Sequence, residues 1–366
     1  MKILHINSNY DRTPLHQAMM DRLDELCQNR VMVPTHDKNC GVLEVGENVL
    51  VKECFFKRDR CCFALKQKKI YKALLDSFRV DEFDLIHAYT LFTDGNIAYK
   101  LHKEYGIPYV VAVRNTDVNA FFKYRPHLRG RGVKILCDAA AVFFLSDSYK
   151  KQVFSAYIPR KYHRELLPKV HVVPNGIDSG WFLDGQPHEA PRGKQIRLVF
   201  AGRIDRNKNV PTAARACALL RKEGYDADFT VIGKVVETAH AEELDKLPFV
   251  KRFGPMDQTQ LKEVYKSRDI FLMPSYTESF GLVYAEAMSQ GLPVIYTKGQ
   301  GFHGQFPEGE VGYAVSPSSP EEIVLAVKKI LQNYEEISRR CVRGSRSFRW
   351  EDLVQYYYGI YKTVSP

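Results

Sequence analysis

The sequence predicts an α/β protein made of two doubly wound domains, each a parallel sheet covered by helices. Short apolar segments alternate with amphipathic ones along the whole chain. Some apolar segments, such as 108–113, are unbroken runs, which is typical of parallel strands buried on both faces. A polar stretch rich in Gly and Pro, 184–193, separates two such series. The length of 366 residues is also too great for one small core.

The first series begins near the N-terminus. Strands are expected at 2–7, 83–88, 108–113, 140–145 and 170–173, because each is a short apolar run. Helices are expected at 15–27 and 96–105, where apolar residues recur every three or four positions.

The second series follows the polar stretch. Strands are expected at 196–201, 228–232, 270–273 and 293–296, and helices at 210–223, 258–267 and 282–289. Strands that alternate with helices of roughly 10–15 residues form right-handed βαβ units and parallel sheets. We therefore expect domains at 1–185 and 186–349. Because ligands of such sheets bind beyond the carboxyl ends of the strands, residues that directly follow strands are the candidate site residues.

Composition and charge exclude several classes of protein. With 45% hydrophobic and 26% charged residues, the chain is neither collagen-like nor disordered. Its longest apolar run, 139–145, is too short to cross a membrane, and the N-terminus lacks a signal peptide's apolar core, so a cytoplasmic location is expected. The eight cysteines contain no C-x-x-C pair, which favours free thiols over disulfides or zinc. A net charge of +10 suits acidic partners without choosing among them.

One motif covers residues 273–288. Its strand ends at Pro274, which cannot continue a central ladder, and a helix is expected to open near Gly281. Backbone amides at a helix N-terminus can hold a phosphate, and here they belong to Ser279, Phe280 and Gly281. Glu278 and Glu286 add carboxylates, which suit sugar hydroxyls as hydrogen-bond acceptors. By spacing alone, two surface glutamates on a capped helix would be the better explanation, and only the context Pro-x3-Glu-Ser-Phe-Gly favours a site.

A second motif covers residues 198–210 and also lies between a strand and a helix. Gly202 lets the chain turn, Arg203 can hold a phosphate with its planar guanidinium, and Lys208 adds a point charge for the same group. Such groups can stabilise a departing diphosphate. Taken alone, the segment would be interpreted as a solvated basic loop.

Weaker candidates follow other strands. Gly233 and Lys234 come after the strand at 228–232 and are placed for a nucleotide, whose base 253–256 would line, although strand-end glycines also form plain turns. The sequence 226–228 matches the D-x-D string of metal-dependent sugar transferases, but it precedes its strand. We expect a structural turn there and no obligatory metal.

The combination of Gly-Arg-x4-Lys (202–208) with Glu-Ser-Phe-Gly-x4-Glu (278–286) resembles the retaining glycosyltransferases of the GT4 family, which have the GT-B fold. Looser similarities, at 84–88, 106–111, 140–146 and 172–178, extend the resemblance over nearly the whole chain.

The resemblance implies two Rossmann-like domains that face each other across a cleft. The first would bind the acceptor and the second a UDP- or GDP-sugar, and the C-terminal helix within 350–366 would return to the first. It further implies transfer of a hexose with retention and no cofactor besides the donor. By the same resemblance, Arg203 and Lys208 bind the diphosphate, Glu278 contacts the donor sugar and Glu286 holds the ribose.

The sequence departs from the family pattern in the first domain. Many relatives have His-Gly-x-Asp where this chain has Arg114, Asn115, Thr116 and Asp117. Arg114 cannot shuttle a proton, but it could hold an anionic acceptor or the donor's phosphate. Asp117 could orient the acceptor or act as a base, and an ion pair between Arg114 and Asp117 is an equal alternative. The N-terminal loop, which contains Asn9, lacks the usual Gly-Gly, so the acceptor is unusual or the site is defective.

Two segments, 55–72 and 121–131, mix aromatic residues with positive charge. They are interpreted as solvated basic faces or as peripheral membrane contacts, and RNA binding is the least favoured alternative.

The sequence therefore predicts a metal-independent hexosyltransferase that acts in the cytoplasm, at most peripherally on the inner face of the membrane. Its acceptor would be a glycan or a lipid-linked sugar in cell-surface polysaccharide or glycolipid synthesis. The alternatives are a non-catalytic protein that binds sugar nucleotides or glycans on the same scaffold, and a GT-B epimerase or phosphorylase. A nicotinamide-dependent dehydrogenase is disfavoured because neither domain has G-x-G-x-x-G after its first strand.

Overall fold

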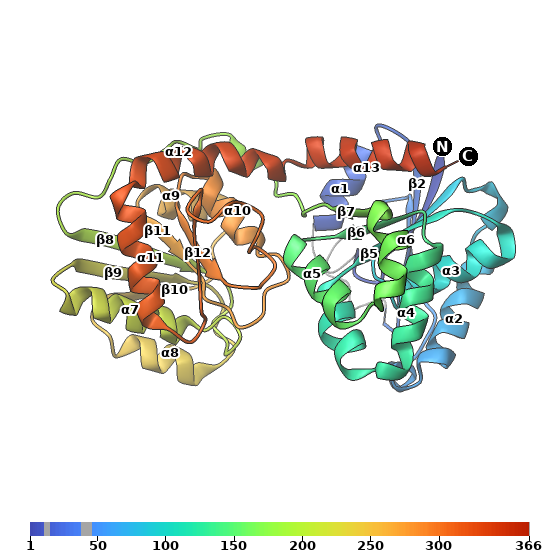
Figure 1. Ribbon diagram of the computed structural model, residues 1–366, viewed down its shortest axis with the longest axis horizontal. Helices are drawn as coiled ribbons and strands as arrows, with labels where there is room; N and C mark the ends of the chain where they lie inside the picture. The colour runs from blue at the N-terminus through green and yellow to red at the C-terminus, as the bar shows by residue number, and fades with distance from the viewer. Residues whose placement is uncertain (11–14, 38–45, 366) are drawn as a thin grey trace. The chain divides into compact units, whose positions relative to one another are not determined.

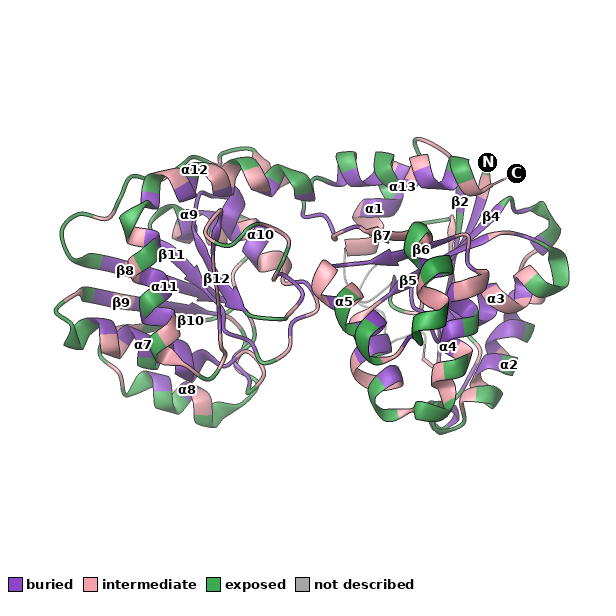
Figure 2. Cartoon of the chain, viewed as in Figure 1, coloured by how far each residue is buried: buried purple, intermediate pink, exposed green. Residues whose placement is uncertain are grey.

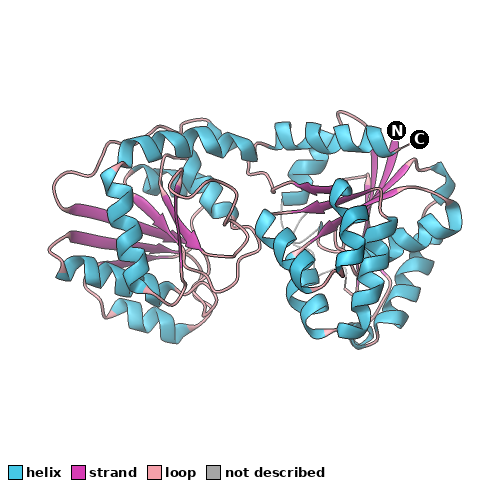
Figure 3. Cartoon of the chain, viewed as in Figure 1, coloured by secondary structure: helices cyan, strands magenta, loops and turns pink. Residues whose placement is uncertain are grey.

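The computed structural model describes residues 1–10, 15–37 and 46–365 and divides into two compact units. The first unit contains Met1–Leu145, Tyr149–Gly176 and Trp350–Pro366. The second contains Ser146–Ser148 and Ile177–Arg349. In both units, parallel strands form a central sheet with helices packed around it (Figure 3). The α/β class predicted from the sequence is confirmed.

The first unit has a seven-stranded parallel sheet in the order β3-β2-β1-β4-β5-β6-β7. Its strands are β1 (Lys2–Ile6), β2 (Gln28–Thr35), β3 (Val49–Glu53), β4 (Leu85–Ala88), β5 (Tyr109–Val113), β6 (Ala141–Phe144) and β7 (Val170–Val172). Its helices are α1 (Leu15–Leu23), α2 (Phe63–Leu75), α3 (Asp94–Tyr105), α4 (Pro126–Asp138), α5 (Asp147–Ala156), α6 (His163–Leu166) and α13 (Trp350–Val364). Strand order therefore reverses between β1 and β4.

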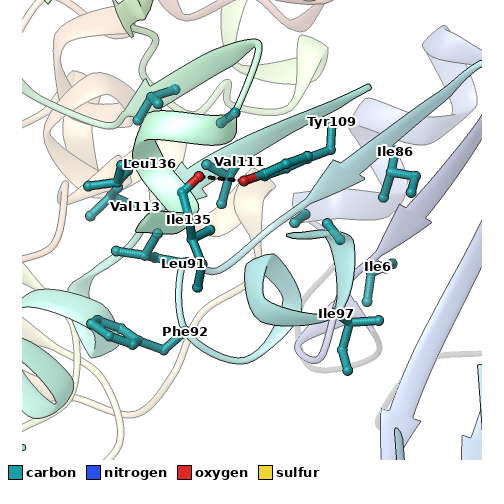
Figure 4. Close-up of a cluster of buried hydrophobic side chains, with 14 of the residues drawn as sticks. Ile6, Ile86, Leu91, Phe92, Ile97, Tyr109, Val111, Val113, Ile135 and Leu136 are labelled. Carbon is teal, nitrogen blue, oxygen red and sulfur yellow. Dashed lines mark hydrogen bonds between the residues drawn. The ribbon is translucent and has the colours of Figure 1, made fainter. Parts of the chain in front are cut away.

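Successive side chains along the strands of this sheet point to opposite faces, and each face has its own hydrophobic core. Leu4 and Ile6 of β1 belong to the larger core, part of which Figure 4 shows around Tyr109, whose hydroxyl donates a hydrogen bond to the Ile135 carbonyl. Ile3 points to the opposite face and joins a second core with Trp350 of α13. In Figure 2 the central strands β1, β4, β5 and β6 are accordingly buried along most of their length, whereas β3 and β7 are only partly buried.

The helix α13 completes the second of these cores. Trp350, Val354, Tyr357 and Tyr361 are all buried there, and α13 lies beside α1 (Figure 1). The helix spans Trp350–Val364, within the segment 350–366 where a C-terminal helix is expected. Residues from the far end of the chain thus pack on the sheet that contains the first strand.

A buried network of polar rings lies under α13. One hydrogen bond joins His5 Nδ1 and the Tyr89 hydroxyl at 3.1 Å, and a second joins His5 Nε2 and Asn29 Oδ1 at 2.8 Å. His87 Nδ1 bonds the Tyr361 hydroxyl of α13 at 2.6 Å. Burial lowers the pKa of His5 to about 4, because a charged imidazole would lose its hydration.

The second unit has a six-stranded parallel sheet in the order β10-β9-β8-β11-β12-β13. Its strands are β8 (Gln195–Ala201), β9 (Asp226–Ile232), β10 (Val250–Phe253), β11 (Ile270–Leu272), β12 (Val294–Thr297) and β13 (Gly312–Val315). Its helices are α7 (Val210–Lys222), α8 (Thr238–Asp245), α9 (Gln258–Lys266), α10 (Leu282–Ser289), α11 (Pro320–Gln332) and α12 (Tyr334–Ser345). Here the strand order reverses between β8 and β11.

Two local expectations differ from the structure. The units divide between Gly176 and Ile177 rather than at 185/186. The stretch 184–193, expected as a linker, packs within the second unit because Gly185 lies against the Ser289 carbonyl, where a Cβ would come within 1.8 Å. The D-x-D residues form the start of β9 rather than a turn, and Asp228 pairs with Arg268 at 3.0 Å.

Among the described residues, none of the helices combines the length and the apolar character needed to span a bilayer.

Candidate functional site

The two strongest sequence motifs meet at the point where the strand order of the second sheet reverses. Strands β8 and β11 are neighbours there, with Ile270 paired to Leu198. The motif 202–208 follows β8, and the motif 274–281 follows β11. Such a reversal opens a crevice beyond the strand ends, which is where doubly wound sheets bind ligands. The fold therefore brings together residues that lie 70 positions apart.

Lys208 and Glu278 form a direct ion pair across this crevice, with Nζ and Oε2 2.6 Å apart. Their side chains are only 17% and 9% exposed, so the pair is largely shielded from water. The backbone fixes the carboxylate further, because the amide of Ser279 donates to Glu278 Oε1 at 3.1 Å. Arg203 is 66% exposed and lies 3.4 Å from Asp205, so its guanidinium faces solvent beside the pair.

Asn207 joins the two motifs through reciprocal hydrogen bonds. Its side-chain amide donates to the Thr277 carbonyl at 2.9 Å, and its side-chain oxygen accepts from the Thr277 amide at 3.0 Å. Its own carbonyl accepts from the Tyr276 amide at 2.8 Å. Since Lys208 and Glu278 are the next residues in the two loops, these bonds set the separation of the ion pair. The sequence interpretation missed Asn207.

Asn209 holds the same loop from the other side. It has a left-handed backbone conformation with φ 56°, which asparagine adopts more readily than most residues. Its buried side chain donates to the Pro274 carbonyl at 3.0 Å and to the Pro317 carbonyl at 2.5 Å. Asn209 also stands at the N-cap of α7, a position where asparagine is favoured, so the sequence contained a signal for it.

The start of α10 presents two free amides. Gly281 caps the helix with φ 79°, where a Cβ would come within 2.5 Å of the Tyr284 ring. The amides of Phe280 and Gly281 donate no hydrogen bond to any described residue. The Ser279 amide, which the sequence predicted to be free as well, is taken by Glu278. The side chain of Phe280 is buried against Phe348, so only its backbone can face a ligand.

Glu286 lies one turn into α10 and is half-buried. Burial, reinforced by the nearby charge of Asp178, raises its pKa to about 7. Its carboxylate makes no hydrogen bond to another described residue, so it is available to a ligand.

Gly233 and Lys234 follow β9 beside this site. A Cβ on Gly233, which has φ 145°, would lie 1.9 Å from the Gly202 carbonyl oxygen, so glycine is required for close approach of the two loops. The Lys234 carbonyl accepts from the Ile204 amide at 2.9 Å, while its side chain is exposed. Phe253, at the end of β10, accepts from the Gly233 amide and is 44% exposed.

A pocket of about 270 Å³ occupies the corresponding reversal point of the first sheet, between β1 and β4. We call it the first-unit pocket. Residues from the ends of five neighbouring strands and from the following helices line it: Ser8, Asn9, Pro34, Thr35, His36, Phe55, Arg60, Phe63, Lys66, Thr90, Thr93, Thr116, Asp117, Phe121 and Arg125. Of the predicted acceptor-side residues, the pocket includes Asn9 and Asp117. Its cations lie within the two basic aromatic segments identified in the sequence.

Asp117 and Arg114 do not form the ion pair that the sequence left open. The buried Asp117 carboxylate accepts from the backbone amides of Leu91, Phe92 and Arg114, at 2.9, 3.1 and 2.9 Å. Burial nevertheless raises its pKa to about 6. The guanidinium of Arg114 donates instead to the Tyr89 carbonyl at 3.4 Å and to Asn175 at 3.2 Å.

Asn115 lies outside the pocket lining and accepts a hydrogen bond from Asn119 at 2.6 Å. This bond ties it to the π-helical segment Asp117–Phe122, which the sequence did not predict. Within the described ranges, no three His, Cys, Asp or Glu side chains are grouped closely enough to bind a metal ion.

Comparison with solved structures shows which proteins have a similar fold. The fold is similar to that of the sucrose-phosphate synthase of Thermosynechococcus elongatus, with a TM-score of 0.75, 18% identity, and 99% and 98% of the two chains covered. It is also similar to HepE of Anabaena in complex with UDP, with a TM-score of 0.72, 15% identity, and 99% and 100% coverage. The two-domain GT-B fold predicted from the sequence is confirmed.

Sequence comparison relates part of the chain to a known protein family. Residues 186–348, which lie within the second unit, match the family described as "Glycosyl transferases group 1". A D-inositol 3-phosphate glycosyltransferase of Paenarthrobacter aurescens (strain TC1) is 25% identical over 294 residues, or 74% of this chain and 70% of that protein. The chain spans a smaller share, 58% and 59%, of two further relatives with the same description.

Proposed function

We propose that the protein is a retaining glycosyltransferase of the GT4 type, which transfers a hexose from a UDP- or GDP-sugar to a glycan or lipid-linked acceptor. The observation that carries this proposal is the arrangement at the β8/β11 reversal. There a shielded Lys208–Glu278 pair, an exposed Arg203 and two amides of α10 that bond to no described residue lie on the loops that follow two neighbouring strands. A diphosphate and a sugar hydroxyl need this combination of cations, amide donors and carboxylate.

In the proposed reaction, the bond between the anomeric carbon and the diphosphate oxygen breaks. A bond from that carbon to the acceptor oxygen forms on the same face of the sugar. The acceptor's hydroxyl proton passes to the departing phosphate oxygen, so no side-chain base is required. Arg203, Lys208 and the amides of Phe280 and Gly281 stabilise the negative charge that develops on the diphosphate. Glu278 positions the hexose, and Glu286 accepts hydrogen bonds from the ribose hydroxyls.

The two cations supply the positive charge that a metal ion supplies in other transferases, so we propose metal-independent transfer with no cofactor besides the donor. A UDP donor is supported by the HepE structure, whose description names UDP. For the cell, we propose a cytoplasmic enzyme of polysaccharide or glycolipid synthesis with peripheral membrane contact. That contact is supported by the exposed rings of Phe56 and Tyr124, which are 56% and 69% exposed and adjoin Lys57 and Lys123. Nucleic acid is not a proposed partner.

The first prediction concerns the diphosphate contacts. Arg203→Ala should slow transfer by about a hundredfold or more, because the variant loses a donor to the leaving group. The measurement is release of nucleoside diphosphate from UDP- and GDP-sugars with a panel of acceptors. Arg206→Ala is the matched control, since Arg206 is an exposed arginine of the same loop with no side-chain contact to a described residue. Equal rates for Arg203→Ala and the unmodified protein would refute the assignment.

A non-catalytic nucleotide-binding protein is the second candidate. It is favoured by one observation: Arg114, which stands where many relatives have His, and the retained Asp117 are both engaged in hydrogen bonds within their own unit. A thermal-shift series with UDP, GDP and ADP identifies the base. Stabilisation by one nucleotide without turnover on any acceptor would support the binding protein, and an epimerised sugar nucleotide or a sugar phosphate would indicate an epimerase or a phosphorylase.

A further inference from the structure

The first-unit pocket contains three cations that form no ion pair with a carboxylate in the part of the chain that the structure describes. Lys66 Nζ lies 4.7 Å from the centre of the Phe55 ring, and the Arg125 guanidinium lies 4.9 Å from that of Phe121. Arg60 contacts His36 Nδ1 at 3.4 Å. None of the three forms an ion pair with another described residue. Cation–π contacts hold a cation in place without neutralising its charge, so the pocket keeps its positive charge.

The carboxylates near the pocket are already occupied. Asp94 accepts hydrogen bonds from the Ser8 and Thr90 hydroxyls, and Asp117 accepts hydrogen bonds from three backbone amides. Neither lies close enough to Lys66 for an ion pair. Asp117 belongs to the lining of the pocket and Asp94 lies behind it, and neither forms an ion pair with the cations of the pocket.

The cations of the pocket also repel one another. Burial lowers the pKa of Lys66, and the charges of Arg60 and Arg125 lower it further, against the opposing effect of Asp94. An anion bound among these side chains would remove that repulsion and replace the lost hydration of Lys66. A neutral sugar would do neither.

The size and position of the pocket suit a small polar group. Its volume of about 270 Å³ is just below the roughly 300–1,000 Å³ of pockets that enclose drug-sized ligands. Asn9 and Thr116 add polar side chains that make no hydrogen bond to another described residue, so they are available to sugar hydroxyls.

We propose that the first-unit pocket binds an anionic group, a phosphate or a carboxylate, carried by a sugar, with Lys66, Arg60 and Arg125 as its cationic contacts. The identification of this anionic sugar as the acceptor rests on the proposed function. Binding of the sugar by the pocket does not depend on that function. The acceptor is thus a phosphorylated or uronic sugar rather than a neutral one.

The test is calorimetric titration with glucose 6-phosphate, glucuronate and glucose as probes, at constant ionic strength. Lys66→Met should weaken binding of the anionic probe by about tenfold or more, since it removes a charged hydrogen-bond donor but keeps the apolar stem. Lys68→Met is the matched control, because Lys68 lies on the exposed side of the same helix and outside the pocket. Arg125→Met provides a second variant if Lys66→Met fails to fold.

The comparison of probes and variants separates the outcomes. Tighter binding of glucose 6-phosphate identifies phosphate as the anion, and tighter binding of glucuronate identifies a carboxylate. Equal affinity for glucose and both anions, or equal affinity in the Lys66→Met, Arg125→Met and unmodified proteins, would overturn the proposal. Titration of UDP against Lys208→Met in the same series reports on the donor site alone, so failure of the proposed function would be seen independently of this pocket.

Discussion

Asn207 illustrates how one side chain can set the geometry of a site that it does not itself enter. Its paired hydrogen bonds to Thr277 bring the loop after β8 against the loop after β11. The two residues that follow, Lys208 and Glu278, are then held 2.6 Å apart. Positioning of this kind is common where catalytic groups lie on separate loops.

We therefore predict that Asn207→Ala will lower kcat by about tenfold or more while the free energy of unfolding falls by only about 1–2 kcal/mol, because two net hydrogen bonds are lost. Steady-state kinetics and urea unfolding measure the two effects. Arg206→Ala should change neither. A loss of stability with unchanged kcat would show that Asn207 only supports the fold.

If Glu286 holds the ribose as we propose, we predict that donor binding depends on pH. Its pKa of about 7 means that about half of the carboxyl is protonated at neutral pH, and only the charged form can accept from both ribose hydroxyls. Below pH 7 the affinity for UDP should fall by nearly tenfold per pH unit, and above pH 8 it should level off. Since the diphosphate titrates as well, the informative quantity is the ratio of affinities between the unmodified protein and Glu286→Gln. A pH-independent ratio between pH 5.5 and 8 would contradict this assignment.

Among the elements, the loops after β8 and β9 touch backbone to backbone. Gly233→Ala should destabilise the second unit by about 2 kcal/mol or more, because the new Cβ would meet the Gly202 carbonyl and the residue has positive φ. Gly254→Ala is the control, since Gly254 follows the neighbouring strand β10 and has open space around its Cα. Thermal unfolding of both variants measures the difference, and similar melting temperatures would refute the close-contact explanation.

The elements also show what could be predicted from the sequence. Central strands such as β5 and β8 were predicted because continuous burial imposes an apolar run that can be recognised locally. The internal strand β2 was missed because Arg30 and Pro34 interrupt its apolar pattern, and the edge strands β3, β10 and β13 were missed as well. Their residues are half-exposed, as in Val250–Phe253, and they owe their extended form to pairing with a neighbour.

The same reasoning applies to the candidate sites. The motifs 202–208 and 278–286 were predicted because they follow central strands, and the reversal of strand order brings them together. The first-unit pocket was not predicted, because its cations come from Arg60, Lys66 and Arg125, which only the tertiary fold brings together. The hydrogen bonds of Arg114 and Asp117 could not be predicted for the same reason, because most of their partners lie far away in the sequence. Their role toward an acceptor stays a prediction.

At the scale of the whole chain, the two units carry one tryptophan each, Trp350 in the first and Trp181 in the second. Both are buried. A Trp181→Phe background therefore gives a fluorescence signal for unfolding of the first unit alone.

In that background, acid should destabilise the first unit through its buried histidines. His5 has a pKa of about 4 in the folded protein and 6.5 when unfolded, so its contribution is complete above pH 6.5 and is lost as the pH falls toward 4. Between pH 7.5 and 4.5, the decrease in the free energy of unfolding should be about 3 kcal/mol smaller in His5→Gln than in the protein with His5. Asp94 and Asp117, whose pKa values burial raises to about 6, act in the opposite direction but are common to both proteins. Parallel pH profiles would contradict this prediction.

The return of α13 to the first sheet has a consequence for biosynthesis. During synthesis, α1 can cover part of the apolar face that contains Ile3, Val31 and Leu85, but the rest of that face stays exposed until Trp350–Val364 has been translated. The second unit needs nothing beyond Arg349 and can therefore complete its fold before the first unit does. A ribosome stalled before codon 350 would hold a chain whose first sheet is still partly exposed, and chaperones would recognise that chain as unfinished.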